Sequence, residues 1–246
     1  MTEKKTTFQR DVYIVDGART PFLKAKGKPG PFSASDLAVS AGRDLLGRQP
    51  FSPQDLDEVI VGCVMPSADE ANIGRVVSLR LGCGKQTPAW TVQRNCASGM
   101  QALDNAAQDI ASGRCDLVLA GGTEAMSRSP LLFNENMVNW LANMSQARTW
   151  KEKLKSWLHF RPTHLKPVIA LLRGLSDPMV NLNMGQTAEI VAHRFGITRD
   201  QMDQFALESH QGAAKGQDEN FFSEVQTIFA PNGEFHPGDD GVRRDS

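Results

Sequence analysis

The chain has 246 residues, of which 40% are hydrophobic and 22% are charged, and its formal net charge is −1. This length fits one large domain or two small ones, and the composition is that of a globular protein. The near-neutral charge argues against nucleic-acid binding. No apolar run approaches the roughly 18 residues that a membrane-spanning helix needs.

The spacing of the four cysteines predicts free thiols. Cys63, Cys83, Cys96 and Cys115 show neither Cys-x-x-Cys nor zinc-like spacing, so we expect no metal site and no disulfide framework. The polar N-terminal sequence MTEKKTTFQR lacks the apolar core of a secretory signal. We therefore expect a cytoplasmic protein.

Residues 1–130 alternate between strand-like and helix-like patterns. We expect buried strands at residues 11–16 and 58–64, the second rich in Val and Ile. Between them, Ser35 and Asp36 are expected to cap a helix that ends near residue 45 or 46. A second helix is expected at residues 71–81.

The pattern continues with a strand at residues 89–92, a helix that Gly113 ends, and an apolar strand at 117–120 before Gly121-Gly122. The helix has an expected apolar face made of Met100, Leu103, Ala106, Ala107 and Ile110. This β-α-β-α-β-α-β order predicts an α/β fold with a mostly parallel sheet covered by helices. Active sites in such sheets lie at the carboxyl ends of the strands.

Cys96 lies at one of these ends, where a strand passes through a sharp turn into a helix. Unpaired amide N–H groups and the positive end of the helix dipole favour thiolate over thiol there. The Cys96 N–H is also placed to donate to an oxyanion. The alternative is a buried packing residue, and spacing alone leaves the two interpretations about even. Cys63, Cys83 and Cys115 are assigned to packing.

After Pro130 the pattern changes. Residues 148–175 are basic, with seven Lys or Arg against the single Glu152, and they interleave Trp150 and Trp157 with aliphatic residues. Such an amphipathic segment is typical of a membrane surface, an acyl-chain tunnel wall or a partner contact. An insertion that packs on its own domain is an equally weighted alternative.

The last third is mainly helical. We expect a helix at residues 183–195, then a capping box of Thr198 and Gln201 before a helix at 202–215. Ser209 and His210 are neighbours on that helix and point apart, so they form no catalytic pair. A strand is expected at residues 225–229, followed by a polar loop.

Three motifs resemble those of the thiolases. Residues 95–102, NCASGMQA, resemble the thiolase nucleophile motif N-C-[SA]-S-G-[LM]-Q-A. Residues 121–127, GGTEAMS, resemble the G-G-x-E-x-M-S turn, and residues 15–22, VDGARTPF, are similar to the family's opening strand and turn. The resemblance covers almost all of this chain but only the first part of a thiolase.

The resemblance implies a βαβαβαββ core at residues 1–130 and an inserted helical loop domain, with the basic amphipathic insertion, at 131–246. It implies that Cys96 is the nucleophile, that Met184 borders the acyl-thioester pocket, and that Arg243 lies near the adenine nucleotide of coenzyme A (CoA). Many thiolases have His before that methionine. This chain has Asn183, for which we expect no polar CoA contact.

The implied reaction is thiolytic cleavage of 3-ketoacyl-CoA in fatty acid β-oxidation, through an acyl-cysteine, with CoA as co-substrate and no permanently bound cofactor. The second thiolase half, with its Gly-His-Pro histidine and Cys-x-Gly cysteine, is absent from this chain, so we expect little turnover by these residues alone. The implied partners are acyl-CoA and CoA, further copies in a homo-oligomer and a hydratase/dehydrogenase subunit, with peripheral membrane contact through 148–175. The alternative is a non-catalytic, thiolase-like lipid- or partner-binding module.

Overall fold

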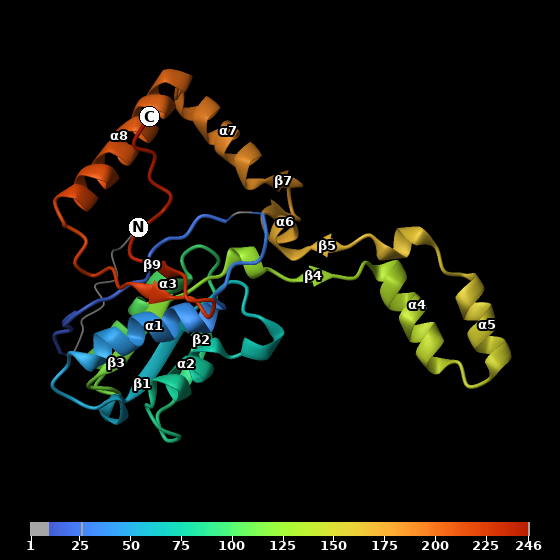
Figure 1. Cartoon of the computed structure of the whole chain (residues 1–246), viewed down its shortest axis with the longest axis horizontal. Coiled ribbons are helices and arrows are strands. Elements are labelled where there is room, and N and C mark those ends of the chain that lie inside the picture. Colours follow the sequence, from blue (N-terminus) through green and yellow to red (C-terminus); the bar gives the residue numbers. More distant parts are fainter. Residues whose placement is uncertain (1–9, 26, 246) are drawn as a thin grey trace, which may run out of the picture. The chain divides into compact units, whose positions relative to one another are not determined.

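The computed structural model describes residues 10–25 and 27–245, and it divides into two compact units (Figure 1). The first comprises the described residues up to Arg128 together with those from Met202 onward, and the second is Ser129–Gln201. Residues 202–245 thus belong to the first compact unit, whereas the sequence-based division assigned them to the loop domain. That division, at residue 130, stays a prediction.

The centre of the first unit is a three-stranded parallel sheet in the order β2-β1-β3. The strands are β1 (Glu58–Gly62), β2 (Ala89–Val92) and β3 (Val118–Gly122). Helix α1 (Ala34–Gly47) precedes β1, while α2 (Ile73–Leu81) and α3 (Ser98–Ala111) connect successive strands. Short 3-10 turns lie at Pro53–Asp55, Ala68–Glu70 and Met126–Arg128. A parallel sheet covered by helices is confirmed.

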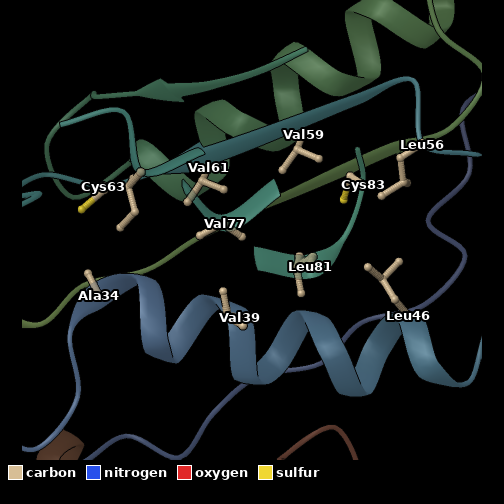
Figure 2. Close-up of a cluster of buried hydrophobic side chains, with 11 residues drawn as sticks. Ala34, Val39, Leu46, Leu56, Val59, Val61, Cys63, Val77, Leu81 and Cys83 are labelled. Carbon is tan, nitrogen blue, oxygen red and sulfur yellow. The ribbon is translucent and has the colours of Figure 1, made fainter. Parts of the chain in front are cut away.

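Alternate residues of β1 face two different hydrophobic clusters, as the two-residue period of a strand requires. Val59 and Val61 pack with side chains of α1 and α2, and Figure 2 shows Ala34, Val39 and Leu46 of α1 facing them. Ile60 points the other way, onto Ala102 and Ala106 of α3. Both faces of the central strand are therefore buried.

The predicted first strand is wrong. Residues 11–16 form no strand, and Tyr13, Ile14 and Val15 are 75%, 86% and 74% exposed. Their composition favours a strand, but strand propensity is realised only against a neighbouring strand. The described sheets supply none to this segment.

Two details of the helices also differ from expectation. Ser33, not Ser35, caps α1, in a capping box with Asp36. On α3 the buried apolar side is formed by small residues, whereas Met100 and Leu103 are 70% and 41% exposed. Ala102 and Ala106 are the residues of α3 that pack on Ile60 of β1.

The second unit is mostly helical. A hairpin of α4 (Glu135–Gln146) and α5 (Trp150–Leu158) is joined by the Trp140 Nε1–H, which donates to the Ser156 carbonyl at 2.8 Å. The remaining elements are a 3-10 turn (Pro162–Leu165), α6 (Ala170–Gly174), α7 (Met184–Phe195), and the strand pairs β4 (Leu131–Leu132) with β5 (Val168–Ile169) and β6 (Ser176–Asp177) with β7 (Leu182–Asn183).

Helix α8 (Arg199–Asp218) continues into the first unit. The predicted capping box is confirmed, because Thr198 Oγ1 accepts from the Gln201 N–H at 3.3 Å and Gln201 Oε1 accepts from the Thr198 N–H at 2.9 Å. The strand predicted at 225–229 is reduced to β8 (Ile228–Phe229), which pairs with β9 (Phe235–His236). None of the helices in the described part of the chain has the length and apolarity that a membrane crossing requires.

Candidate active site

Cys96 lies in a tight turn between β2 and α3, at the carboxyl edge of the sheet. Asn95, directly before it, has a left-handed φ of +48°. The Ala97 and Ser98 N–H groups donate to the carbonyls of Arg94 and Asn95, both at 3.1 Å. A non-glycine residue in this region is held by its surroundings, and such residues cluster at functional sites. The turn leaves Cys96 exposed.

Ser98 holds the turn together from inside. Its hydroxyl accepts from the Arg94 N–H at 2.8 Å and donates to the Asn95 carbonyl at 2.6 Å, and the residue is only 4% exposed. Because this hydroxyl is engaged and the N-cap residue is Ala97, no side chain caps α3. The first turn of α3, which follows Cys96 directly, therefore begins with N–H groups that have neither an intrahelical acceptor nor a side-chain cap.

Two glycines let the first turn of α3 lie directly against the sheet. A Cβ placed on Gly62, the last residue of β1, would be 2.4 Å from the Ser98 carbonyl carbon. A Cβ on Gly122, the last residue of β3, would be 3.0 Å from the Gly99 Cα. The Cys96 turn and the Gly121-Gly122 turn thus meet at one edge, as the sequence predicted.

Glu124 links the loops after β3 and β1. Its Oε2 accepts from the Val64 N–H at 2.8 Å and its Oε1 from the Met65 N–H at 3.3 Å. Glu124 is absent from the predicted site residues, although an acid two residues beyond a glycine pair at a strand end is a usable signal. Its carboxylate fixes the backbone next to the site.

The other three cysteines are buried. Burial, together with the nearby charge of Glu124, raises the pKa of Cys63 to about 12. Burial also raises the pKa of Cys83 and of Cys115. These groups are therefore protonated packing residues, as predicted, and Cys96 is the one cysteine of the four that solvent reaches.

The two predicted CoA-contacting residues lie in different units. Met184 is the first residue of α7, in the second unit, and is 48% exposed. Asn183 caps this helix, since its side chain accepts from the Gln186 N–H at 2.8 Å. Arg243 lies in the first unit, where its N–H donates to His210 Nδ1 at 3.2 Å.

The comparisons with known proteins agree with this geometry. The family model described as "Thiolase, N-terminal domain" matches residues 12–244. A parallel α/β sheet with an exposed cysteine at its carboxyl edge fits a protein that uses a cysteine nucleophile. The chain belongs to the thiolase family, in the part that this N-terminal domain covers.

The curated relatives include a trifunctional enzyme subunit and a 3-ketoacyl-CoA thiolase. The chain is 35% identical to the mitochondrial trifunctional enzyme subunit beta of Bos taurus over 96% of its own length and 49% of that protein's. It is 33% identical to a 3-ketoacyl-CoA thiolase of Yersinia pestis, over 96% and 54%. The chain therefore spans about half the length of the curated relatives it matches.

Solved structures give the same result. The fold matches human mitochondrial 3-ketoacyl-CoA thiolase in complex with CoA with a TM-score of 0.79 at 31% identity, covering 97% of this chain and 56% of that one. It matches the acetyl-CoA acetyltransferase of Bacillus anthracis with a TM-score of 0.75 at 29% identity, covering 93% and 53%.

Proposed function

We propose that Cys96 is the acyl-accepting nucleophile in thiolytic cleavage of 3-ketoacyl-CoA, a step of fatty acid β-oxidation. Its Sγ attacks the C3 keto carbon, and the C2–C3 bond breaks with its electron pair leaving on C2. C2 then takes a proton to give acetyl-CoA, and the shortened acyl group stays on sulfur as a thioester. The thiolate of a second CoA attacks this thioester, expels Sγ and forms the shortened acyl-CoA.

The observation that carries this proposal is the exposed thiol of Cys96 next to the N-terminus of α3, which no side chain caps. The Cys96 N–H is placed to stabilise the oxyanion that forms at the attacked carbonyl. The three buried cysteines lack this environment. The reaction is supported further by the names of the relatives, a 3-ketoacyl-CoA thiolase among them.

Two proton transfers need groups that these 246 residues do not contain. The thiolase resemblance assigns them to a Gly-His-Pro histidine and a Cys-x-Gly cysteine, and the sequence has neither motif. None of the five histidines follows a glycine. We therefore expect acylation at most, and little turnover, from these residues alone.

For CoA recognition we propose Met184 beside the acyl-thioester pocket and Arg243 near the adenine nucleotide. Within the described residues the Arg243 guanidinium has no hydrogen bond or ion pair, although its backbone is held by His210. A cation with a fixed backbone and a free head group suits a phosphate-bearing ligand. One of the solved relatives was determined with CoA bound.

The test is intact-mass spectrometry of the chain after incubation with acetoacetyl-CoA, beside a Cys96→Ala control. We expect an acetyl adduct that the control lacks, because this thiol alone is exposed. A Cys83→Ala variant is the matched comparison and should keep the adduct. An adduct that survives in Cys96→Ala, or its absence from a folded wild-type chain, would contradict the proposal for these residues.

We also propose that helix α5 docks on an anionic membrane surface, which narrows the predicted contact at 148–175. Trp150, Leu154 and Trp157 are 69%, 51% and 66% exposed and share one face of the helix. Lys151 and Lys153 flank that face, Lys155 lies farther round the helix, and all three are exposed. Aromatic residues with flanking lysines are typical of helices that lie in the membrane interface.

The relative named as a trifunctional enzyme subunit also supports a hydratase/dehydrogenase partner subunit.

Flotation with anionic liposomes tests this surface. The triple change of Lys151, Lys153 and Lys155 to Glu should abolish flotation, because each lysine near an anionic surface contributes about 1 kcal/mol. The same change at Lys24, Lys28 and Lys85, which are also exposed, should have little effect. Equal loss in both variants would indicate only a net-charge effect, and unchanged flotation would favour the partner subunit instead.

For location we propose the cytoplasm, since all four cysteines are free thiols and disulfides are rare there. Cell fractionation is the direct measurement, and recovery of the protein in a secreted or organellar fraction would contradict it.

A further inference from the structure

Arg19 of the VDGARTPF motif joins two distant parts of the first unit. Its Nη1 and Nη2 donate to the two carboxylate oxygens of Asp239 at 2.8 and 3.0 Å, and its Nε donates to Glu224 Oε1 at 3.0 Å. The Arg19 and Asp239 side chains are only 26% and 16% exposed. A guanidinium that binds a carboxylate through two parallel hydrogen bonds makes a strong and directional pair.

Aromatic rings and backbone hydrogen bonds complete this contact. The Arg19 guanidinium lies 5.0 Å from the ring centre of Phe22 and 5.5 Å from that of Phe222. The Arg19 N–H donates to the Glu224 carbonyl, and the Arg19 carbonyl accepts from Gln226, both at 2.9 Å. We call Arg19 and Asp239, with these surroundings, the Arg19 clasp.

The clasp fixes one end of the segment that carries Arg243. The Phe22 N–H donates to Asp239 Oδ1 at 2.7 Å, and the Asp240 N–H donates to the Phe22 carbonyl at 3.2 Å. At the other end, Arg243 is held by His210, and Arg244 pairs with Asp218 at 2.9 Å. Residues 239–244 are thus pinned between the N-terminal turn and α8, while the Arg243 side chain stays free.

We propose that Arg19 and Asp239 are positioning residues that hold Arg243 in place for the nucleotide part of CoA. The inference rests on the proposed CoA contact of Arg243 and adds to it the residues on which that contact depends. Neither Arg19 nor Asp239 needs to touch the ligand. The pair is fully charged at neutral pH, because the Arg19 hydrogen bonds hold the pKa of Asp239 below its usual value.

The test compares Arg19→Lys and Asp239→Asn with wild type, using the whole chain. Lysine keeps the charge but not the two-pronged geometry, and asparagine keeps the oxygen that accepts from Phe22 but not the charge. Arg80→Lys is the matched control, since Arg80 pairs with Asp36 on other elements of the same unit. Calorimetry gives the Kd for CoA and for pantetheine, which lacks the nucleotide, and hydrogen exchange follows residues 239–244.

Both clasp variants should bind CoA roughly tenfold more weakly, or about 1.4 kcal/mol, with unchanged pantetheine affinity and faster exchange in residues 239–244. Equal weakening for both ligands, or unchanged CoA affinity and exchange, would overturn the positioning role.

Arg243→Ala separates the positioning proposal from the proposed CoA contact of Arg243. If it leaves CoA affinity unchanged, or if wild type binds no CoA, the contact itself is wrong. If it weakens CoA binding but the clasp variants do not, only the clasp proposal fails.

Discussion

Gly62 determines how closely the nucleophile turn approaches the sheet. Because glycine has no side chain, the Ser98–Gly99 backbone can lie directly against Gly62 at the end of β1. The sequence presents Gly62 only as the last residue of a Val- and Ile-rich run. Its role depends on a helix that begins 36 positions later, which spacing along the chain cannot reveal.

We predict that Gly62→Ala lowers the free energy of unfolding by about 1–3 kcal/mol, because the new methyl group overpacks against backbone atoms. It should also slow alkylation of Cys96, since the turn must shift. Urea denaturation and iodoacetamide kinetics measure the two effects. Gly121→Ala is the control, because a Cβ there meets nothing within 4 Å. Equal effects of the two substitutions would contradict this explanation.

The candidate site was only partly predictable from its residues. Cys96 could be selected because its neighbours match a motif and because it follows a strand. The partners of Glu124 and Arg19 could not be predicted, since they are backbone N–H groups of another loop and a carboxylate 220 positions away. Such contacts exist only once the chain has folded.

At the level of elements, strand β1 is tied to β2 and α3 by a partly buried acidic cluster. Glu58 Oε1 accepts from the Trp90 Nε1–H at 2.6 Å, and Asp109, which pairs with Arg114 at 2.8 Å, lies beside it. Burial, and then the neighbouring Asp109, raises the pKa of Glu58 above its usual value. This cluster lies away from Cys96, at the start of β1.

The raised pKa makes stability depend on pH. Folded Glu58 keeps its proton to a higher pH than unfolded Glu58, so the folded state binds more protons in that window. Stability should therefore fall as pH rises from the ordinary glutamate pKa of about 4.3 through the raised value. Glu58→Gln, which retains an acceptor for Trp90, should remove this loss and be more stable than wild type at pH 7.

Urea denaturation between pH 4 and pH 8, followed by tryptophan fluorescence, measures this difference. The advantage of Glu58→Gln should shrink toward pH 4, where the wild-type carboxyl is also neutral. Asp69→Asn is the control, because Asp69 is exposed. An advantage that does not change with pH would refute the titration argument.

The elements themselves were predicted unevenly. Strand β1 and helix α3 follow from their apolar periods, and α8 follows from its capping box. Residues 11–16 have an equally good strand pattern, yet they remain unpaired. The sequence pattern of a strand indicates which side chains can be buried. Whether the strand forms depends on a neighbouring strand that can pair with it.

For the molecule as a whole, the largest unexplained feature is exposed apolar surface. Met100 and Leu103 lie on one outer face of α3, and Tyr13, Ile14 and Val15 are exposed as well. Large apolar side chains left exposed in this number favour association with another surface. This agrees with the homo-oligomer expected from the sequence and with a chain that spans about half the length of its relatives.

We predict that the 246-residue chain self-associates, and that Met100→Gln with Leu103→Gln reduces the association. Sedimentation velocity over a concentration series measures it. A double change of Leu79 and Phe205 to Gln, at exposed apolar positions on two separate helices, should have less effect. A stable monomer at every concentration would show that these surfaces do not associate.

The Arg19 clasp also bears on how the protein is made. Arg19 and Asp239 are separated by 220 positions, so a ribosome must synthesise that whole interval before they can meet. Until then the N-terminal turn lacks its carboxylate partner, while the sheet and α1 to α3 already have theirs. Contacts between such distant residues form slowly and late. The clasp would then form late in the folding of these residues, after synthesis has passed residue 239.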